Sequence, residues 1–300
     1  MTTITEGRLD AGGLDVAYLA AGEPDAPLAA CLHGFPDSAH GWRHLLPALA
    51  DAGYRAVAPF LRGYAPTAIP ADGCYQAGAV AADAIALHEA LGGGADAVLV
   101  GHDWGALAAY GAAGSAPERW RRVVTAAVPP PATVATGFFS YDQLRRSWYM
   151  FFFQSPLSDF AVAADDLAFL DRLWADWSPG LSPDQVATEV AHVKDCLRDP
   201  DHLTAALGYY RATLGAGKRD AAFDAVEAAG TAPLPMPVLY LHGADDGCMG
   251  AELIDDTVLA SLPHPESRVE VLAGAGHFLQ IDRPDETNRA ILDFLGPARP

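Results

Sequence analysis

The apolar residues of this chain form short runs that alternate with helical patterns. The runs ADAVLV (95–100) and MPVLYLH (236–242) are apolar on both faces, which is typical of strands buried between two layers of helices. The stretch GAVAADAIALHEALGGG (78–94) has helical spacing and ends at glycines, as helices commonly do. Near the start, GGLDVAYLAAG (12–22) alternates weakly and predicts an edge strand or hairpin. The chain as a whole therefore predicts a mostly parallel sheet flanked by helices on both faces.

The pattern changes in the middle of the chain. From about residue 132 to 229 it is helical and rich in aromatic residues, and it contains no convincing strand. We therefore expect an α/β core, residues 1–131 and 230–300, with a helical cap, residues 132–229, inserted into it. Such an insertion would cover the carboxyl ends of the strands, where open α/β sheets bind ligands.

Composition and charge narrow the function. With 51% hydrophobic and 19% charged residues, the 300-residue chain can bury a large core. Its formal net charge of -19 repels phosphate backbones, so we expect no nucleic-acid partner. The start of the chain shows no secretion signal, and no apolar run approaches the roughly 20 residues of a membrane helix. These features favour a cytoplasmic protein with no membrane partner.

The cysteines are scattered, which favours reduced thiols over disulfides or a zinc site. None has a cysteine or histidine neighbour at the spacing that a zinc site would need. We therefore expect no metal. The four are Cys31, Cys74, Cys196 and Cys248.

The segment GHDWG (101–105) has the spacing of a nucleophile elbow. Asp103 follows a predicted strand and precedes a predicted helix, with Gly101 and Gly105 two residues to either side. Small neighbours permit the sharp, strained turn that exposes the central side chain. The alternative is an ordinary turn whose aspartate caps the helix.

Two later loops supply partners for Asp103. GADD, after a predicted strand, offers Asp245 and Asp246, and GAGHF, after the next strand, offers His277. The chain order nucleophile, acid, histidine is typical of a hydrolase of this architecture. Because each lies just beyond the carboxyl end of a strand, we expect them to form one site.

These motifs, together with HGFPDS (33–38), make the chain resemble the α/β-hydrolase superfamily, and within it the epoxide hydrolase branch with an aspartate nucleophile. The resemblance covers essentially the full length. It implies the α/β-hydrolase fold, a mostly parallel central sheet with an inserted helical cap, and it implies that Asp246, not Asp245, is the acid of the triad. One departure is that the family's usual APD-x-RG loop reads APFLRG here, which we interpret as a change in structural support at Phe60.

A carboxylate nucleophile indicates attack on a saturated carbon. It is ionised at neutral pH and can displace a leaving group to form an alkyl ester on Asp103. Water activated by His277, whose imidazole Asp246 would orient, would then hydrolyse the ester. The backbone N–H groups of Phe35 and Trp104 would form the oxyanion hole for this second step.

Two cap tyrosines favour an epoxide as the substrate. SWYMFFFQSP resembles the epoxide hydrolase segment that supplies the first oxygen-binding tyrosine, here Tyr149. LGYYRATL resembles the second, here Tyr210, with Tyr209 as its rival. A tyrosine is protonated at neutral pH and can donate to the leaving oxygen. The alternative is that these tyrosines are ordinary core aromatics.

Two other functions remain open. A haloalkane dehalogenase would use the same Asp-His-Asp triad, and the indole N–H of Trp104 could bind the halide. Many of those enzymes, however, carry asparagine at the position of Phe35. A binding protein without catalysis is also compatible with the fold, but it would predict a broken triad or lost tyrosines.

The aromatic cap suggests an apolar or aromatic epoxide. We expect Trp148, Phe152, Phe153 and Phe278 to contact it. Hydrolysis by this route needs water alone, so no cofactor is expected. A homodimer is the default expectation for the assembly. Lone histidines without partners at useful spacing, such as His88, are expected on the surface.

Overall fold

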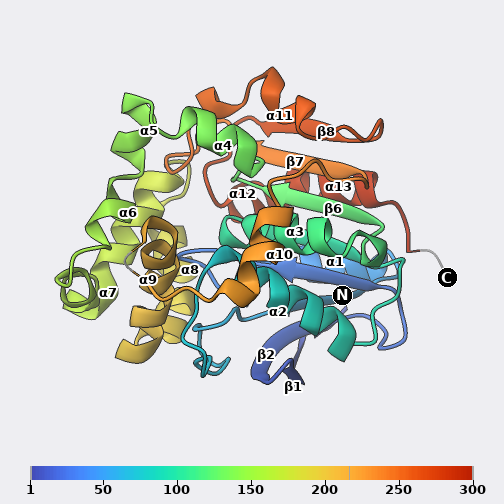
Figure 1. Cartoon of the computed structure of the whole chain (residues 1–300), viewed down its shortest axis with the longest axis horizontal. Coiled ribbons are helices and arrows are strands. Elements are labelled where there is room, and N and C mark those ends of the chain that lie inside the picture. Colours follow the sequence, from blue (N-terminus) through green and yellow to red (C-terminus); the bar gives the residue numbers. More distant parts are fainter. Residues whose placement is uncertain (1, 216, 299–300) are drawn as a thin grey trace.

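A computed structural model describes residues 2–215 and 217–298 of the chain. An eight-stranded sheet in the order β1-β2-β4-β3-β5-β6-β7-β8 runs through its centre, with helices on both faces (Figure 1). The pairings of β2 with β1 and β4 are antiparallel, and all the others are parallel. The strands are β1 (Thr5–Ala11), β2 (Leu14–Ala21), β3 (Leu28–Leu32), β4 (Arg55–Pro59), β5 (Val98–His102), β6 (Arg122–Ala126), β7 (Val238–Gly243) and β8 (Arg268–Leu272).

Burial explains the sequence pattern of the strands. Every residue of β3, β5 and β7 is buried, because helices cover both faces of the middle of the sheet. The edge strand β8 has no fully buried residue. The hairpin expected near the start is formed by β1 and β2. The predicted α/β architecture is confirmed.

Among the described residues, three α-helices connect the strands from β3 to β6, two follow β8, and a short one lies between β7 and β8. They are α1 (Leu45–Asp51), α2 (Ala77–Ala90), α3 (Trp104–Ser115), α12 (Leu279–Asp282) and α13 (Pro284–Leu295), with α11 (Asp256–Ala260) before β8. Short 3-10 helices are η1 (Ala39–Trp42), η2 (Pro117–Arg119), η3 (Ala221–Phe223) and η4 (Ala251–Leu253).

The segment between β6 and β7 is helical, and its described residues form no strand. Helices α5 to α9 gather at one end of the sheet (Figure 1), whereas α10 packs on α2 and α3 of the core. The division into a core and a cap of residues 132–229 stays a prediction. The helices are α4 (Pro131–Gly137), α5 (Tyr141–Arg146), α6 (Trp148–Phe152), α7 (Ser158–Trp177), α8 (Pro183–Leu197), α9 (Pro200–Leu214) and α10 (Asp224–Ala229).

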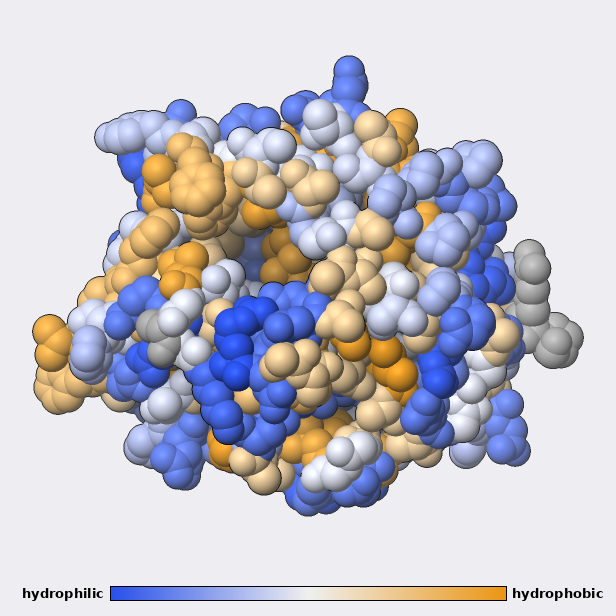
Figure 2. All heavy atoms as spheres, in the orientation of Figure 1, coloured by the Kyte–Doolittle hydropathy of each residue, from blue (hydrophilic) through white to orange (hydrophobic). Residues whose placement is uncertain are grey.

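The end of α7 is bonded directly to two loops of the sheet. The carbonyl of Trp177 accepts the backbone N–H of Gly247 at 3.1 Å and that of His277 at 2.9 Å. Three residues earlier, the indole Nε1 of Trp174 donates to the carbonyl of Pro36 at 2.7 Å. These bonds fix the helical segment over the carboxyl ends of the strands. Figure 2 shows that the surface is hollowed between this segment and the core, with hydrophobic side chains beside and above the hollow and hydrophilic ones below it.

Two residues outside the predicted site, His88 and Phe60, are buried and pack against neighbouring rings. His88 was expected on the surface, and this prediction is wrong: the residue is 2% exposed. Its ring packs edge-on against Trp120 at 4.8 Å, and Nε2 bonds to the carbonyl of Gly94, so its polar atoms are accommodated. Phe60 is also buried and packs against the ring of His40, in keeping with a role in supporting its loop.

All four cysteines are free and buried. Within the described part of the chain, no helix has both the length and the apolar character needed to cross a membrane.

Candidate active site

The turn between β5 and α3 holds Asp103 in a strained backbone conformation. Its φ of 54° and ψ of -116° lie in a region that residues other than glycine rarely adopt. A Cβ on Gly101 would collide with the carbonyl of Gly105, and a Cβ on Gly105 with that of Leu32, so the turn requires both glycines. The side chain of Asp103 makes no capping bond to α3. The turn therefore presents the carboxylate instead of using it to cap the helix.

The two oxygens of Asp103 face different partners. Oδ1 accepts the backbone N–H of Phe35 at 2.7 Å. Oδ2 lies 3.7 Å from Nε2 of His277. Trp104 follows at the first position of α3, where a backbone N–H has no helical acceptor. One oxygen is thus held by the expected oxyanion loop, and the other faces the expected base.

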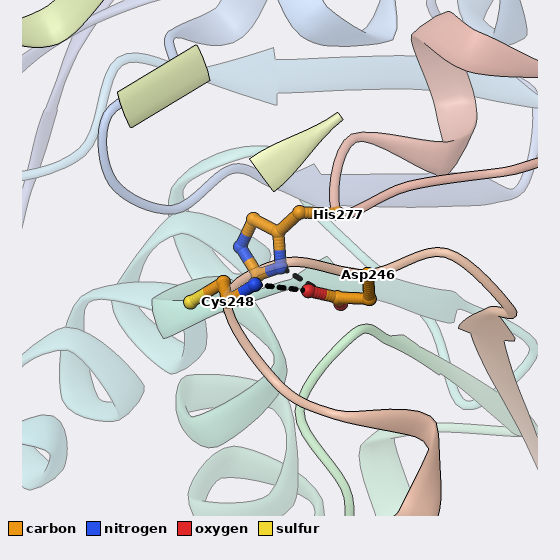
Figure 3. Close-up of side chains that lie close together, drawn as sticks. All are labelled: Asp246, Cys248 and His277. Carbon is orange, nitrogen blue, oxygen red and sulfur yellow. Dashed lines mark hydrogen bonds and ion pairs between the residues drawn. The ribbon is translucent and has the colours of Figure 1, made fainter. Parts of the chain in front are cut away.

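The loops after β7 and β8 bring Asp246 and His277 together. Nδ1 of His277 bonds to Oδ2 of Asp246 at 3.0 Å, and Oδ1 of Asp246 accepts the N–H groups of Cys248 and Met249 at 2.7 and 2.8 Å (Figure 3). Asp246 and His277 are both buried, whereas Asp245 is exposed. Of the two adjacent carboxylates, only Asp246 is in contact with the histidine.

The charges of this site stabilise one another. Burial lowers the pKa of His277, but the carboxylates of Asp246 and Asp103 outweigh it and raise the pKa to about 10. Burial likewise raises the pKa of Asp246, but the neighbouring His277 cation brings it below its ordinary value. In the free protein, His277 is therefore an imidazolium between two carboxylates.

Tyr149 and Tyr210 reach this site from the cap. Their rings lie 5.4 Å apart, and the ring of Tyr210 is 5.2 Å from Phe35 and 5.1 Å from Trp104. Burial raises the pKa of both tyrosines well above the ordinary value, and the negative charge of Asp103 adds to the effect. Both phenols are therefore protonated near the nucleophile.

The hydroxyl groups of the cap tyrosines differ in their bonds. That of Tyr210 has no hydrogen-bond partner among the described residues, whereas that of Tyr149 is 3.3 Å from Sγ of Cys248. Tyr209, the rival candidate, donates its hydroxyl to the carbonyl of Arg62 at 2.8 Å. Tyr209 thus joins α9 to the core, and the geometry favours Tyr210 as the second cap tyrosine of the site.

Two of the four expected substrate-contacting aromatics lie beside the triad and the tyrosines. Phe153 is buried against Phe35 and Tyr210, at ring distances of 5.6 and 5.2 Å. Phe278 is 5.1 Å from the ring of His277 and stacks on Trp174 at 3.6 Å. Both lie close to the place where a substrate would react.

The other two expected contacts lie further out. Phe152 is half-buried and packs on Phe153 and Phe169, at ring distances of 6.1 and 6.0 Å. Trp148 is 48% exposed and packs on Phe152 and Phe169. The structure does not bring Trp148 to the triad, because the first turn of α6 directs Tyr149 inward and Trp148 outward.

Two histidines near the site support its loops. Nε2 of His33 accepts the N–H of Leu61, and Nδ1 bonds to the carbonyl of Gly34 at 2.9 Å, which holds the loop that presents Phe35. His102 bonds through Nε2 to the carbonyl of His277 at 2.9 Å. Both are structural neighbours of the reacting groups.

The sequence pattern missed two residues at the site. The ring of Trp177 lies 5.1 Å from that of His277 and 4.9 Å from that of Tyr149, but in the sequence it is one of several aromatics in an amphipathic stretch. Cys248 contacts Tyr149, and its only signal was its place two residues after the predicted acid.

Asp246, Cys248 and His277 are residue types that can bind zinc, and their ligand atoms lie within 4.8 Å of one another. However, the carboxylate of Asp246 already accepts three N–H groups, including Nδ1–H of His277. A metal ion would have to break these bonds, so the donor set fits a hydrogen-bonded triad better than a metal site.

Comparisons with known proteins agree with this fold. Residues 30–284 match the model of the alpha/beta hydrolase fold family. Epoxide hydrolase A of Mycobacterium tuberculosis is 30% identical over 97% of this chain and 97% of its own length. Epoxide hydrolase 4 of Mus musculus is 30% identical over 96% of this chain and 78% of its own length. Among solved structures, that of Epoxide Hydrolase A from Mycobacterium thermoresistibile is 28% identical, with a TM-score of 0.79 and 99% of both chains covered.

Proposed function

Because the chain belongs to the alpha/beta hydrolase family, we propose that it is an epoxide hydrolase, which adds water to an epoxide to form a vicinal diol. The observation that carries the proposal is the placement of Asp103 between the Phe35 N–H and His277, with two protonated tyrosines nearby. The names of the relatives support the same reaction.

In the first step, Oδ2 of Asp103 attacks an epoxide carbon and a C–O bond of the ring breaks. The departing oxygen keeps the electron pair and takes a hydrogen bond, and then a proton, from the cap tyrosines. Tyr149 and Tyr210 suit this role because burial and the nearby carboxylate keep their hydroxyl groups protonated. The product of this step is an alkyl ester on Asp103.

In the second step, His277 takes a proton from water, and the resulting hydroxide attacks the carbonyl carbon of the ester. Negative charge develops on Oδ1 of Asp103, which already accepts the N–H of Phe35. The bond between this carbon and the ester oxygen then breaks, and the leaving oxygen takes the proton of the added hydroxyl, which releases the diol and regenerates the carboxylate. Asp246 keeps the imidazole in the orientation and tautomer that this requires.

The two steps are coupled through the charge of Asp103. His277 must lose its proton before it can act as a base, yet two carboxylates raise its pKa to about 10 in the free protein. Formation of the ester removes the charge of Asp103 and lowers the pKa of His277, and the proton that His277 loses replaces the one that the tyrosine gave to the epoxide oxygen. The first step therefore prepares the base for the second.

Dehalogenation is the second candidate, and one observation favours it. The indole Nε1 of Trp104 is buried and has no hydrogen-bond partner among the described residues, so it could donate to a halide. The two phenol donors beside the nucleophile favour an epoxide, because an alkoxide needs a proton on leaving and a halide does not.

A parallel assay separates the two functions. We expect diol formation from styrene oxide and no halide release from 1-bromobutane, and the reverse result would make the protein a dehalogenase. A single turnover in ¹⁸O-water then tests the covalent route. The first diol should contain unlabelled oxygen from Asp103 while the label enters the protein, whereas direct attack by water would label the diol.

A further inference from the structure

Cys248 is a buried thiol at the site for which the mechanism above has no use. It lies in the loop after β7, two residues beyond Asp246, and it is 1% exposed. Figure 3 shows that its sulfur points away from the carboxylate of Asp246. Sγ instead lies 3.3 Å from the hydroxyl oxygen of Tyr149, within hydrogen-bond distance for sulfur.

Hydrogen bonds fix the position of Cys248 on both sides. Its N–H donates to Oδ1 of Asp246 at 2.7 Å, and its carbonyl accepts Nε2 of Gln143 at 2.9 Å. The same Nε2 donates to Oγ of Ser147 at 2.8 Å, two residues before Tyr149. The buried amide of Gln143 therefore ties the loop of the triad acid to the start of the helix that carries Tyr149.

The thiol is protonated and can act as a donor. Burial raises the pKa of Cys248 well above its ordinary value, and the carboxylates of Asp246 and Asp103 add to the effect. A neutral thiol has one S–H and can also accept a weak hydrogen bond. In the free protein either Cys248 or Tyr149 can be the donor of the bond between them. Once Tyr149 donates its proton to an epoxide oxygen, only the thiol can be the donor.

We propose that Cys248 is a positioning residue for Tyr149, and that its S–H donates to the phenolic oxygen while Tyr149 donates to the epoxide oxygen. This rests on the proposed function. The bonds that form and break are those of the first step, between Asp103 and the epoxide carbon and between that carbon and oxygen. The thiol keeps its proton in this step, and its hydrogen bond stabilises the partial negative charge on the phenolic oxygen of Tyr149 in the transition state.

The two cap tyrosines are therefore not equivalent. The hydroxyl of Tyr210 has no hydrogen-bond partner among the described residues, and its ring packs on the indole of Trp104 and not on a thiol. Tyr149 is the one of the two whose hydroxyl a neighbouring side chain positions. Opening of the epoxide depends on Cys248 through Tyr149, whereas hydrolysis of the ester does not.

The experiment isolates ester formation by use of the His277→Gln background, in which the ester should accumulate. Rapid quenching after mixing with styrene oxide, followed by intact-mass measurement, gives the rate constant. We expect Cys248→Ala and Cys248→Val to lower it by about tenfold, which is the scale of one hydrogen bond to a developing charge. Cys248→Ser, which retains a donor, should stay within about threefold of the parent. Cys196→Ala is the matched control: it removes another buried thiol that does not contact the cap tyrosines, and the rate constant should not change.

The decisive comparison adds Tyr149→Phe. If Cys248 acts through Tyr149, Cys248→Val should have no further effect once the hydroxyl is gone. The same loss in both backgrounds, in variants whose thermal unfolding shows that they are folded, would overturn the positioning role. Cys248→Ala and Cys248→Val fill the space of the thiol differently. If the loss came from packing alone, the rate constants of these two variants would differ. A wild-type protein that forms no diol would instead refute the proposed function, and the inference with it.

Discussion

Oδ2 of Asp103 lies 3.7 Å from Nε2 of His277, close enough for charge attraction but beyond ordinary hydrogen-bond distance. The nucleophilic oxygen therefore faces the base without being tied to it by a hydrogen bond. The opposite oxygen is held at 2.7 Å by Phe35, which orients the carboxylate. Five predictions test the chemistry that this arrangement implies.

Replacement of His277 by Gln should trap the intermediate. Without a base, ester hydrolysis should slow by about 10²–10⁴-fold while ester formation continues, because Asp103 needs no base to attack. Intact-mass measurement after addition of styrene oxide should show the mass of one substrate added to the protein. A peptide digest should place it on Asp103, and an adduct elsewhere would contradict the mechanism.

Adjacent tyrosines on α9 provide a matched pair. Tyr210→Phe should lower the rate of ester formation by about 100-fold, because it removes a donor to the leaving oxygen. Tyr209→Phe should leave that rate within about threefold but cost about 1 kcal/mol of stability, since it removes the bond to the carbonyl of Arg62. Single-turnover kinetics and denaturant unfolding measure the two effects. If instead Tyr209→Phe slows ester formation and Tyr210→Phe only lowers stability, Tyr209 is the residue that binds the epoxide oxygen.

The pKa of His277 should depend on the charge of Asp103. Asp103→Asn imitates the neutral ester, so the imidazole should titrate at a lower pH than in the wild type, where its pKa is about 10. An NMR titration of the ring protons measures both values. Asp245→Asn is the control, because this exposed carboxylate lies next to Asp246 but does not contact the histidine. If the pKa of His277 were the same in the wild type and in Asp103→Asn, the proposed coupling between the two steps would be contradicted.

Stability should follow the same ionisation. His277 has a pKa near 6.5 when unfolded and about 10 when folded, so its charge stabilises the folded state fully below pH 6.5. This contribution is lost as the pH rises through 10. The difference in unfolding free energy between the wild type and His277→Gln should therefore shrink from pH 6 to pH 9.5. A difference that stays constant would show that the imidazolium is not stabilised as described.

Substrate preference should reflect the aromatic surroundings of the nucleophile. Phe35, Phe153 and Tyr210 pack around one another next to Asp103, and no lysine or arginine side chain contacts the nucleophile among the described residues. We expect kcat/KM to be higher for aryl epoxides than for aliphatic ones and lowest for charged ones. Parallel assays of the three classes decide this, and a preference for charged epoxides would contradict it.

The sequence predicts the framework of the site because the core follows simple rules. Buried parallel strands have continuous apolar runs, and the loops after them lie at a common edge, so Asp103, His277 and one of Asp245 and Asp246 could be placed together; the choice of Asp246 came from the family resemblance. Glycine spacing around Asp103 carried the same information, since small residues are what the strained turn requires.

The cap could be predicted less well. Helices α6 and α7 carry aromatics on both their buried and their exposed sides, so periodicity cannot say which aromatic faces the nucleophile. Trp148 and Tyr149 are adjacent, yet the first is half-exposed and the second is buried. The contact between Cys248 and Tyr149 joins residues 99 positions apart, and no local pattern signals it.

The carbonyl of Trp177 accepts one N–H from the loop of the acid and another from the loop of the histidine. The last residue of a cap helix therefore helps to set the distance between two members of the triad. Exchanging this cap for that of a relative, as a way to obtain new substrate ranges, would disturb the triad unless the end of α7 were retained. In this protein, the unit to exchange is therefore the cap without the end of α7.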